Sequence, residues 1–259
     1  IIDQDIMRRN GDTMHISYEK YHKANNLSED RFRFGSNMAI LAGDLCVYFA
    51  NELLADLKLK NNLKAIKELN RLIPWVIYGQ LLDILAELRS TNFDAIMKIN
   101  RLKTSTYTIE GPLRVGAILG GATEKDLDKL SKFAIPLGKA FQIQDDILGL
   151  YGDENKLGKP IGSDLKEGKR NILITKSIEL ASEENKQLLN SFIGKKDISE
   201  ADINSARKII HDCGALKFTE DLALYFVNDA KKGLKDIDGN NESLKFIEWL
   251  SDYIVKRKD

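Results

Sequence analysis

The stretch Phe141-Gln-Ile-Gln-Asp-Asp-Ile-Leu-Gly-Leu-Tyr-Gly-Asp153 decides the fold class of this chain of 259 residues. It closes a longer segment in which apolar residues recur every three or four positions, at 127, 130, 133, 137, 141 and 148. That spacing predicts an amphipathic helix over about 124–151. Asp145 and Asp146 stand near its C-terminal end, where acids oppose the helix dipole and repel each other. We expect a cation to compensate them, and a hard divalent metal ion is the simplest candidate.

The same helical spacing runs through the rest of the chain. Only four prolines are present, and no segment shows strand-like alternation of any length. The first residues are expected to continue a helix, and further helices are expected over about 34–57, 63–90, 93–110, 113–120, 171–183, 185–193, 199–213, 215–236 and 241–257. Pro74 predicts a kink in its helix, and Thr123 with Asp126 predicts a capped helix start. We expect one all-α domain over residues 1–259, with a long functional loop at 152–170.

Composition excludes several classes of protein. The 39 basic and 39 acidic side chains balance, so no net field favours nucleic acid or an anionic membrane. Cys46 and Cys213 are too few for a disulfide framework and match no zinc spacing. No run reaches the roughly 18 apolar residues of a membrane span, and no signal peptide is visible. These features predict a cytoplasmic protein without a transmembrane segment.

Two clusters of charged residues are candidates for binding a polyanion. Acids from Asp3 onward precede the pair Arg8-Arg9, and guanidinium groups match phosphate oxygens. Taken alone, a solvated charged helix end explains this cluster better. Lys103-Thr104 lies in an otherwise apolar helical segment, where a lysine beside a hydroxyl could donate to phosphate; taken alone, ordinary surface placement explains it better. Gln80 and Asp83, three residues apart amid leucines, are expected to be buried polar groups that need partners.

Two further features surround the aspartate pair. Gln142 lies three residues before Asp145 and shares its helix face, and Gly149 lies four residues after it, where a further acid could have joined the same site. The loop Leu157–Arg170 is rich in lysine and glycine, which suggests a mobile lid that brings positive charge to an anion. The loop lacks the GxxxxGK[ST] pattern, which excludes a P-loop. Together, two acidic motifs about 140 residues apart and scattered cations fit metal-bridged binding of a diphosphate.

On these residues the chain resembles the trans-isoprenyl diphosphate synthases, the polyprenyl synthetase family. Phe141–Asp146 is similar to the family's second aspartate-rich motif, and the residues from Gly158 to Lys169 are similar to the loop that follows it. Asp3 with Arg8-Arg9 is similar to the tail of the first motif. The block Thr106–Leu113 and the short first motif resemble archaeal short-chain farnesyl and geranylgeranyl diphosphate synthases. By this resemblance, helices that precede Ile1, with the first two aspartates of the first motif, are absent from the sequence.

The resemblance implies a fold and an activity. The fold would be the isoprenoid synthase fold, an antiparallel helical bundle around a central prenyl cavity, usually a homodimer with 34–57 and 63–90 as dimer elements. The activity would be condensation of isopentenyl diphosphate with an allylic diphosphate, which gives an all-trans prenyl diphosphate of farnesyl to geranylgeranyl length. Nucleic acid is not an expected partner.

The resemblance also assigns roles to residues. Magnesium, or manganese in its place, would be held by Asp3, Asp145 and Asp146. The implied catalytic residues are Asp3, Asp145, Asp146 and Lys103. The implied substrate-binding residues are Arg8, Arg9, Lys103, Thr104, Gln142, Lys159 and Lys169.

One departure from the family pattern leaves alternatives open. Gly149 stands where the second motif carries its third aspartate. A non-catalytic partner subunit of another synthase is therefore one alternative, although the retained arginines and lysines argue against it. A terpene cyclase or squalene-type synthase is another, because such enzymes also ionise prenyl diphosphates with aspartate-rich helices. Arg8-Arg9 and the Gly-Lys-Pro loop favour chain elongation.

Overall fold

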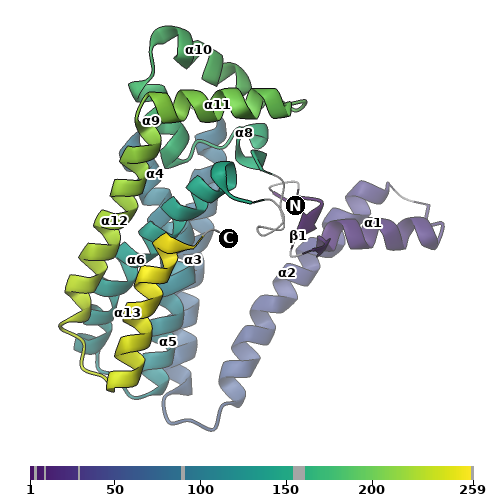
Figure 1. The fold of residues 1–259 in the computed structure, drawn as a ribbon. Coiled ribbons are helices and arrows are strands. Elements are labelled where there is room, and N and C mark those ends of the chain that lie inside the picture. Colours follow the sequence, from purple (N-terminus) through teal and green to yellow (C-terminus); the bar gives the residue numbers. More distant parts are fainter. Residues whose placement is uncertain (3–4, 9, 29, 89–90, 154–160, 258–259) are drawn as a thin grey trace.

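The computed structural model describes the chain apart from residues 3–4, 9, 29, 89–90, 154–160 and 258–259. Helices of the described part form a bundle in which α6 packs against η1 and α12, with α13 beside α12 (Figure 1). The helices are α1 (Met14–Ala24), α2 (Arg31–Asp56), α3 (Asn62–Leu88), α4 (Phe93–Ile99), η1 (Asn100–Glu110), α5 (Gly111–Leu119), α6 (Glu124–Tyr151), α8 (Ser163–Glu167), α9 (Ile172–Leu180), α10 (Glu183–Phe192), α11 (Glu200–Asp212), α12 (Ala215–Leu234) and α13 (Asn241–Lys256). The all-α class is confirmed, and most predicted helix ends fall within about three residues of the observed ones.

The central helix α6 forms where its apolar spacing predicts. Its start is a capping box, in which the Thr123 hydroxyl accepts from the Asp126 amide and the Asp126 carboxylate accepts from the Thr123 amide. Its apolar stripe is covered: Phe133 and Leu137 are fully buried and pack with Val227 of α12 and Ile254 of α13. Burial on several sides makes α6 a rigid platform for the residues at its C-terminal end.

The N-terminal residues correct the prediction of a helix there. Met7–Arg8 (β1) and Gly11–Asp12 (β2) pair as a short antiparallel hairpin. Asn10 has a φ of 60°, a left-handed conformation that asparagine tolerates, and a glycine follows it. Asn-Gly is a strong hairpin signal, and here it outweighs the helical spacing. The helix α1 and the short α8 inside the predicted loop were also missed.

The single helix predicted over 93–110 is wrong in its second half, because residues 100–110 form a π-helix, η1. The hydroxyls of Ser105 and Thr106 donate to the carbonyls of Asn100 and Arg101, five residues earlier, at 3.2 and 2.9 Å. These hydrogen bonds match the wider π turn, a geometry that is frequent at functional sites.

Two glycines let η1 lie unusually close to its neighbours. A Cβ at Gly79 of α3 would be 2.4 Å from the Lys103 amide nitrogen, and a Cβ at Gly138 of α6 would be 2.4 Å from Cα of Ser105. Real Cβ atoms do not approach so closely, so any side chain at either position would push η1 away. The π-helix is therefore wedged between α3 and α6, with Lys103 and Thr104 held at the contact.

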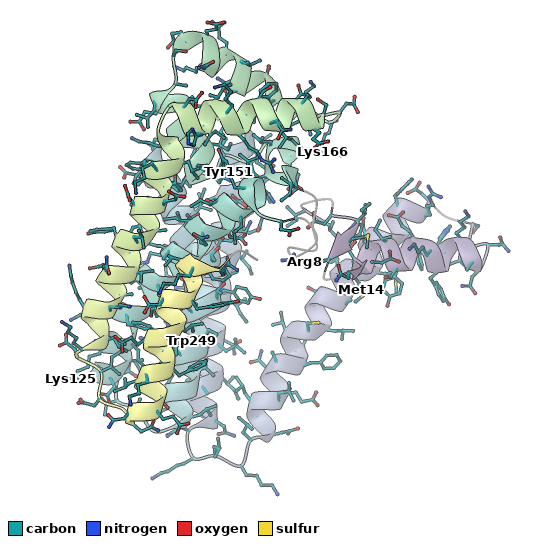
Figure 2. The ribbon with its side chains drawn as sticks, viewed as in Figure 1. Arg8, Met14, Lys125, Tyr151, Lys166 and Trp249 are labelled. Carbon is teal, nitrogen blue, oxygen red and sulfur yellow. The ribbon has the colours of Figure 1, made fainter. Side chains whose placement is uncertain are left out.

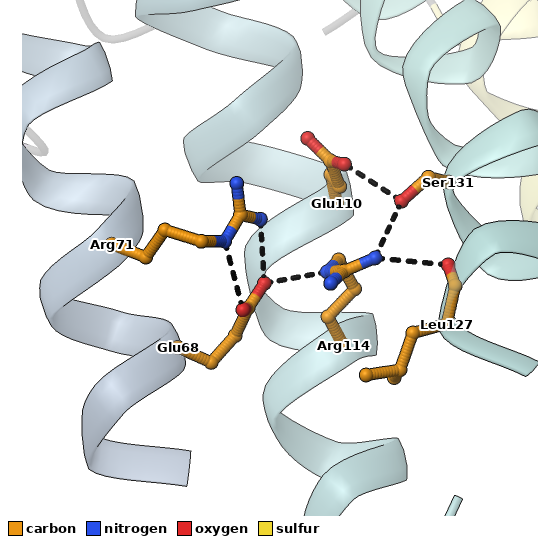
Figure 3. Close-up of polar contacts among 6 residues, drawn as sticks. All are labelled: Glu68, Arg71, Glu110, Arg114, Leu127 and Ser131. Atoms are coloured by element: carbon orange, nitrogen blue, oxygen red, sulfur yellow. Dashed lines mark hydrogen bonds and ion pairs between the residues drawn. The ribbon is translucent and has the colours of Figure 1, made fainter. Parts of the chain in front are cut away.

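A buried ionic network ties α3 to α5. Glu68 accepts two hydrogen bonds from Arg71, at 2.9 and 2.7 Å, and one at 2.5 Å from Nε of Arg114 on α5 (Figure 3). Burial alone would raise the pKa of Glu68, but the hydrogen bonds from the two arginines outweigh it and the pKa is lowered.

The same network reaches α6 and η1. Nη1 of Arg114 donates to the Leu127 carbonyl and to the Ser131 hydroxyl, each at 3.0 Å (Figure 3). The Ser131 hydroxyl in turn donates to Glu110 of η1 at 2.7 Å. Four helices are thus fixed in register at the end of α6 opposite to the aspartate pair. No sequence signal pointed to this network.

The helix α2 differs from the rest of the bundle. It leaves the main bundle after its junction with α3 and carries α1 at its far, N-terminal end (Figure 1). Gly35 is its only buried residue. By length and composition, α2 is the one helix in the described part of the chain that could cross a membrane, with a mean hydropathy of 1.4. One such helix is weak support for a membrane span, because core helices of soluble proteins pass the same test.

Candidate active site

The structure brings three predicted residues of η1 and α6 into one hydrogen-bonded chain. The Thr104 hydroxyl donates to Oε1 of Gln142 at 2.6 Å. Nε2 of Gln142 donates to Oδ1 of Asp146 at 2.8 Å, one turn further along α6. The amide of Gln142 is therefore oriented at both ends, and one oxygen of Asp146 is fixed relative to η1.

Lys103 points to the neighbouring helix α3. Its Nζ lies 2.5 Å from Oδ2 of Asp83, and both side chains are partly exposed. Asp83 thus holds the ammonium group of Lys103 in place. The expectation that Asp83 has a polar partner is confirmed. Gln80, one turn before it, is half-buried.

The two adjacent aspartates of α6 have opposite surroundings. Asp146 is 4% exposed, and its Oδ2 is buried with no hydrogen-bond partner among the described residues. Burial raises the pKa of Asp146 well above its ordinary value. The Gln142 hydrogen bond and the backbone amide of Ile172 lower this pKa, and the nearby charges of Asp164 and Asp145 raise it. Asp145 keeps 39% of its side chain exposed. The pair therefore offers one buried and one accessible carboxylate.

The accessible carboxylate faces an arginine that sequence reasoning missed. Nη2 of Arg257 lies 3.6 Å from Oδ1 of Asp145, and its guanidinium lies over the Phe141 ring at 4.4 Å. The Gln144 side chain donates to the Arg257 carbonyl at 3.3 Å. Nε and Nη2 of Arg257 are buried without hydrogen-bond partners in the described structure. A basic residue near the end of the sequence was the only local signal, and nothing in it indicates contact with α6.

The loop after α6 brings a further lysine to this end of the bundle. Nζ of Lys169 forms an ion pair with Glu167 at 2.7 Å, and the Lys169 amide donates to the Asp164 carbonyl at 2.9 Å. Arg8 is exposed on β1 of the N-terminal hairpin (Figure 2). The predicted site residues Asp3, Arg9 and Lys159 lie outside the described residues.

The donor atoms of α6 fit a hard divalent cation. Carboxylate oxygens are the ligands that magnesium prefers, and the buried Oδ2 of Asp146 lacks the partner that a buried charge requires. In the described part of the chain, no group of three histidine, cysteine, aspartate or glutamate side chains is arranged to hold a metal ion by itself. The remaining ligands would come from water, from a bound diphosphate or from other residues of the chain, as is usual for magnesium.

Comparison with known proteins identifies the fold. A geranylgeranyl pyrophosphate synthase from Corynebacterium glutamicum, solved with isoprenyl diphosphate and magnesium, superposes with a TM-score of 0.93. The two are 32% identical, and the match covers 99% of this chain and 73% of that one. A geranylgeranyl pyrophosphate synthetase from Pyrococcus horikoshii superposes with a TM-score of 0.81 at 29% identity, over 99% of this chain and 73% of that one. The chain therefore has the helical isoprenoid synthase fold.

Sequence comparison gives the family. A geranylgeranyl diphosphate synthase from Sulfolobus acidocaldarius is 31% identical over 100% of this chain and 74% of its own length. A geranylfarnesyl diphosphate synthase from Aeropyrum pernix is 32% identical over 99% of this chain and 76% of its own length. The polyprenyl synthetase family model matches residues 1–210. The chain belongs to the polyprenyl synthetase family and is an enzyme of the prenyltransferase class.

Proposed function

We propose that this prenyltransferase condenses isopentenyl diphosphate with an allylic diphosphate, and that its reacting diphosphate binds at the contact between η1 and α6. The observation that carries the proposal is the chain of contacts from Thr104 through Gln142 to Asp146, with Lys103 fixed beside it. A hydroxyl of η1 and a buried carboxylate of α6 are thus joined through Gln142, and Lys103, the residue before Thr104, is held by Asp83 of α3. That combination suits a diphosphate bound together with a divalent metal ion.

Each described residue has a proposed role. Lys103, held by Asp83, would donate to an anionic oxygen of the allylic diphosphate, with Thr104 and Gln142 beside it and Lys169 approaching from the loop. Arg8 would contribute to the same binding. Arg257, 3.6 Å from Oδ1 of Asp145, would keep positive charge beside this carboxylate and the diphosphate. Asp3, Arg9 and Lys159 lie outside the described residues, and their proposed roles are those that the resemblance implies.

Magnesium, or manganese in its place, would be held by Asp3, Asp145 and Asp146. When bound, magnesium supplies Lewis-acid stabilisation of the leaving diphosphate. The buried surroundings of Asp146 exclude water from that side of the site, which strengthens the carboxylate–cation interaction. The buried apolar residues of α6 would fix the helix, and its two aspartates would hold the ion.

The proposed product is an all-trans prenyl diphosphate. The relatives include geranylgeranyl and geranylfarnesyl diphosphate synthases, so the proposed range extends from farnesyl to geranylfarnesyl length, one isoprene unit beyond the sequence expectation. A cyclase, a squalene-type synthase and a non-catalytic partner subunit are not favoured by these relatives.

The direct test is an assay of the full-length protein. Magnesium, isopentenyl diphosphate and dimethylallyl, geranyl or farnesyl diphosphate are supplied, and products are measured by mass spectrometry. Longer prenyl diphosphates are expected. Hydrocarbon release without consumption of isopentenyl diphosphate, or turnover only after addition of a second synthase, would contradict the proposal. Asp145→Ala is expected to abolish turnover with unchanged helical circular dichroism; a retained rate would remove Asp145 from the metal site.

Three further properties are proposed alongside this activity. Residues 1–259 form a single catalytic domain that acts in the cytoplasm and binds no nucleic acid. Two copies associate through α2 and α3. The support for dimerisation is the apolar surface of these helices, whose exposed large side chains include Leu41, Leu45, Phe49, Trp75, Tyr78 and Leu81.

A further inference from the structure

The outer side of α13 carries a row of aromatic side chains. Phe246, Trp249 and Tyr253 are three and four residues apart, so they share one side of the helix. The ring centroids of Phe246 and Trp249 lie 5.8 Å apart, and those of Trp249 and Tyr253 lie 5.3 Å apart in a stacked arrangement. The three residues are 59%, 55% and 44% exposed, in that order; Figure 2 labels Trp249. We call this row the aromatic ridge.

The aromatic ridge is not the side by which α13 joins the bundle. The inner side of the helix, with the buried residues Ser251 and Ile254, packs on α6 and α12 (Figure 1). Ser251 is two residues from both Trp249 and Tyr253, so it points to the opposite side of the helix. Single exposed hydrophobic residues are ordinary, but three neighbouring rings on a helix that has already buried its apolar side indicate a further contact.

The area of the aromatic ridge argues against a second copy or another protein as the partner. An aromatic side chain has about 150–250 Å² to bury, so three rings exposed by roughly half offer about 300 Å². A stable protein interface buries about 800 Å² on each partner. A lipid bilayer requires neither that area nor a matching shape, and tryptophan and tyrosine rings favour its boundary with water.

The basic side chains beside the aromatic ridge are complementary to anionic lipid. Lys245 precedes Trp249 by four residues and Lys256 follows Tyr253 by three, so each lysine adjoins a ring. Both lysines are exposed, and neither forms an ion pair with a residue that the structure describes. A lysine can lay its apolar stem along a ring while its ammonium group reaches a lipid phosphate.

The acidic side chains of α13 do not cancel this charge. Asp252, beside the ridge, is paired with Lys231 of α12 at 2.7 Å. Glu248 is not three or four residues from any of the rings, so it projects from another side of the helix. Glu242 adjoins only the first ring, at the start of α13, where an acid favours the helix dipole. Positive charge therefore gathers around the other two rings, although the protein as a whole has no net charge.

We propose that the aromatic ridge docks this protein on the surface of an anionic lipid bilayer. The three rings lie at the level of the lipid headgroups, and Lys245 and Lys256 contact lipid phosphates. Arg257, which reaches Asp145, follows Tyr253 by four residues, so one end of the docked helix adjoins the proposed active site. The ridge itself lies outside that site, and the inference does not depend on the proposed function.

The test is binding to lipid vesicles. Full-length protein is sedimented with vesicles of phosphatidylcholine and phosphatidylserine, and separately with vesicles of phosphatidylcholine alone. The wild type should bind the mixed vesicles more tightly. Phe246→Ala, Trp249→Ala and Tyr253→Ala together should weaken that binding by at least about tenfold, because it scales with the apolar area buried. Tyr225→Ala, at a ring of α12 that is 59% exposed, is the control and should bind within about twofold of the wild type.

The contribution of charge is tested in the same assay. Lys245→Glu with Lys256→Glu should weaken binding to the mixed vesicles by at least about tenfold, since both side chains then repel the anionic surface. Lys125→Glu with Lys196→Glu makes the same change of charge at exposed lysines far along the chain from α13 and should have little effect. Circular dichroism checks that each variant is folded.

Tryptophan fluorescence locates the contact. The chain has two tryptophans, so Trp75→Phe leaves Trp249 as the only one, and its emission should shift to shorter wavelength when mixed vesicles are added. A wild type that does not bind the mixed vesicles, a triple-alanine variant that binds them equally well, or an unshifted Trp249 emission would overturn the inference. So would a ridge that holds two copies together in analytical ultracentrifugation without binding vesicles. Prenyl transfer assayed without lipid tests the proposed function separately.

Discussion

The helices α6 and α2 have similar lengths, 28 and 26 residues, and both carry regularly spaced apolar side chains. Thirteen residues of α6 are buried, whereas Gly35 is the only buried residue of α2. The apolar face of α6 is covered by η1, α9, α12 and α13, while α2 packs on α1 and α3.

The difference teaches what an apolar pattern specifies. Spacing predicts that a face will be covered, but it does not say whether the same chain or a second copy covers it. In α6 the cover comes from the chain itself, so the acids at its end are held in fixed positions. In α2 the apolar face remains exposed, which supports its proposed place in a dimer interface.

The largest difference in stability is expected when a phenylalanine is replaced by alanine, once in α6 and once in α2. Phe133 of α6 is fully buried, and Phe49 of α2 is 53% exposed. Phe133→Ala should lower the free energy of unfolding by about 3–5 kcal/mol, because it empties a packed site. Phe49→Ala should change the stability of the monomer by less than about 0.5 kcal/mol. Urea unfolding at low protein concentration measures both; equal losses would contradict the comparison.

The buried network beside α6 should show the next largest effect. Arg114→Ala leaves Glu68 without one of its two arginines in a buried place and should cost about 3 kcal/mol. The control is Lys217→Ala at the exposed Lys217–Asp221 pair, which should cost less than about 1 kcal/mol. If Arg114→Ala and Lys217→Ala have similar midpoints of urea unfolding, the buried network stabilises the protein no more than an exposed ion pair does.

The buried network of Glu68, Arg71 and Arg114 also determines how the stability of the protein changes with pH. The pKa of Glu68 in the folded protein is below its ordinary value of 4.5, since its hydrogen bonds to Arg71 and Arg114 favour the charged form despite burial. Its contribution is therefore present above pH 4.5 and is lost as the pH falls through the lowered pKa. The stability difference between the wild type and Glu68→Gln should narrow on acidification below pH 4.5; a constant difference would contradict this assignment.

A smaller effect of opposite sign is expected at the functional end of α6. Asp146 holds a buried oxygen without a hydrogen-bond partner among the described residues. Asp146→Asn removes the buried charge and should raise the stability of the metal-free protein by roughly 1–3 kcal/mol at neutral pH. It should also abolish turnover. A thermal melt in a metal chelator measures the gain, and a loss of stability would mean that the charge is already compensated.

The smallest effect on monomer stability is expected on α2, where the readout is assembly. Leu45→Glu places a charge on an exposed apolar surface and should leave the fold intact, within about 0.5 kcal/mol. If α2 forms the proposed interface, the variant should be a monomer in analytical ultracentrifugation where the wild type is a dimer. Lys58→Glu, a charge change just beyond the same helix, is the control; a dimeric Leu45→Glu variant would contradict the proposed interface.

Much of the fold could be predicted because the signals are local. The helix α6 begins after the predicted N-cap, Thr123, and runs to Tyr151 as its apolar spacing predicted. The misses also have local or tertiary causes. The hairpin at Met7–Asp12 follows from Asn10-Gly11, a local turn signal that the prediction of a helix did not use. The π-helix η1, by contrast, packs closely against Gly79 and Gly138, a contact that no local signal indicates.

The candidate site divides in the same way. Gln142, Asp145 and Asp146 were identifiable because one helix carries them at a regular spacing, and the resemblance to a family added the lysines and arginines. Arg257 was not identifiable as a partner of Asp145, because it reaches α6 from another part of the chain.

The sequence by itself determined that this protein is helical, that α6 has a face to bury, and that two adjacent acids end that helix in need of a cation. These properties depend on residues a turn or two apart, whose relative positions a helix sets. Only the tertiary structure decided that Lys103 is held by Asp83, that Thr104 and Gln142 fix one oxygen of Asp146, and that Arg257 lies beside Asp145. Those contacts join helices and loops far apart in the chain, and their distances exist only once the whole bundle has packed.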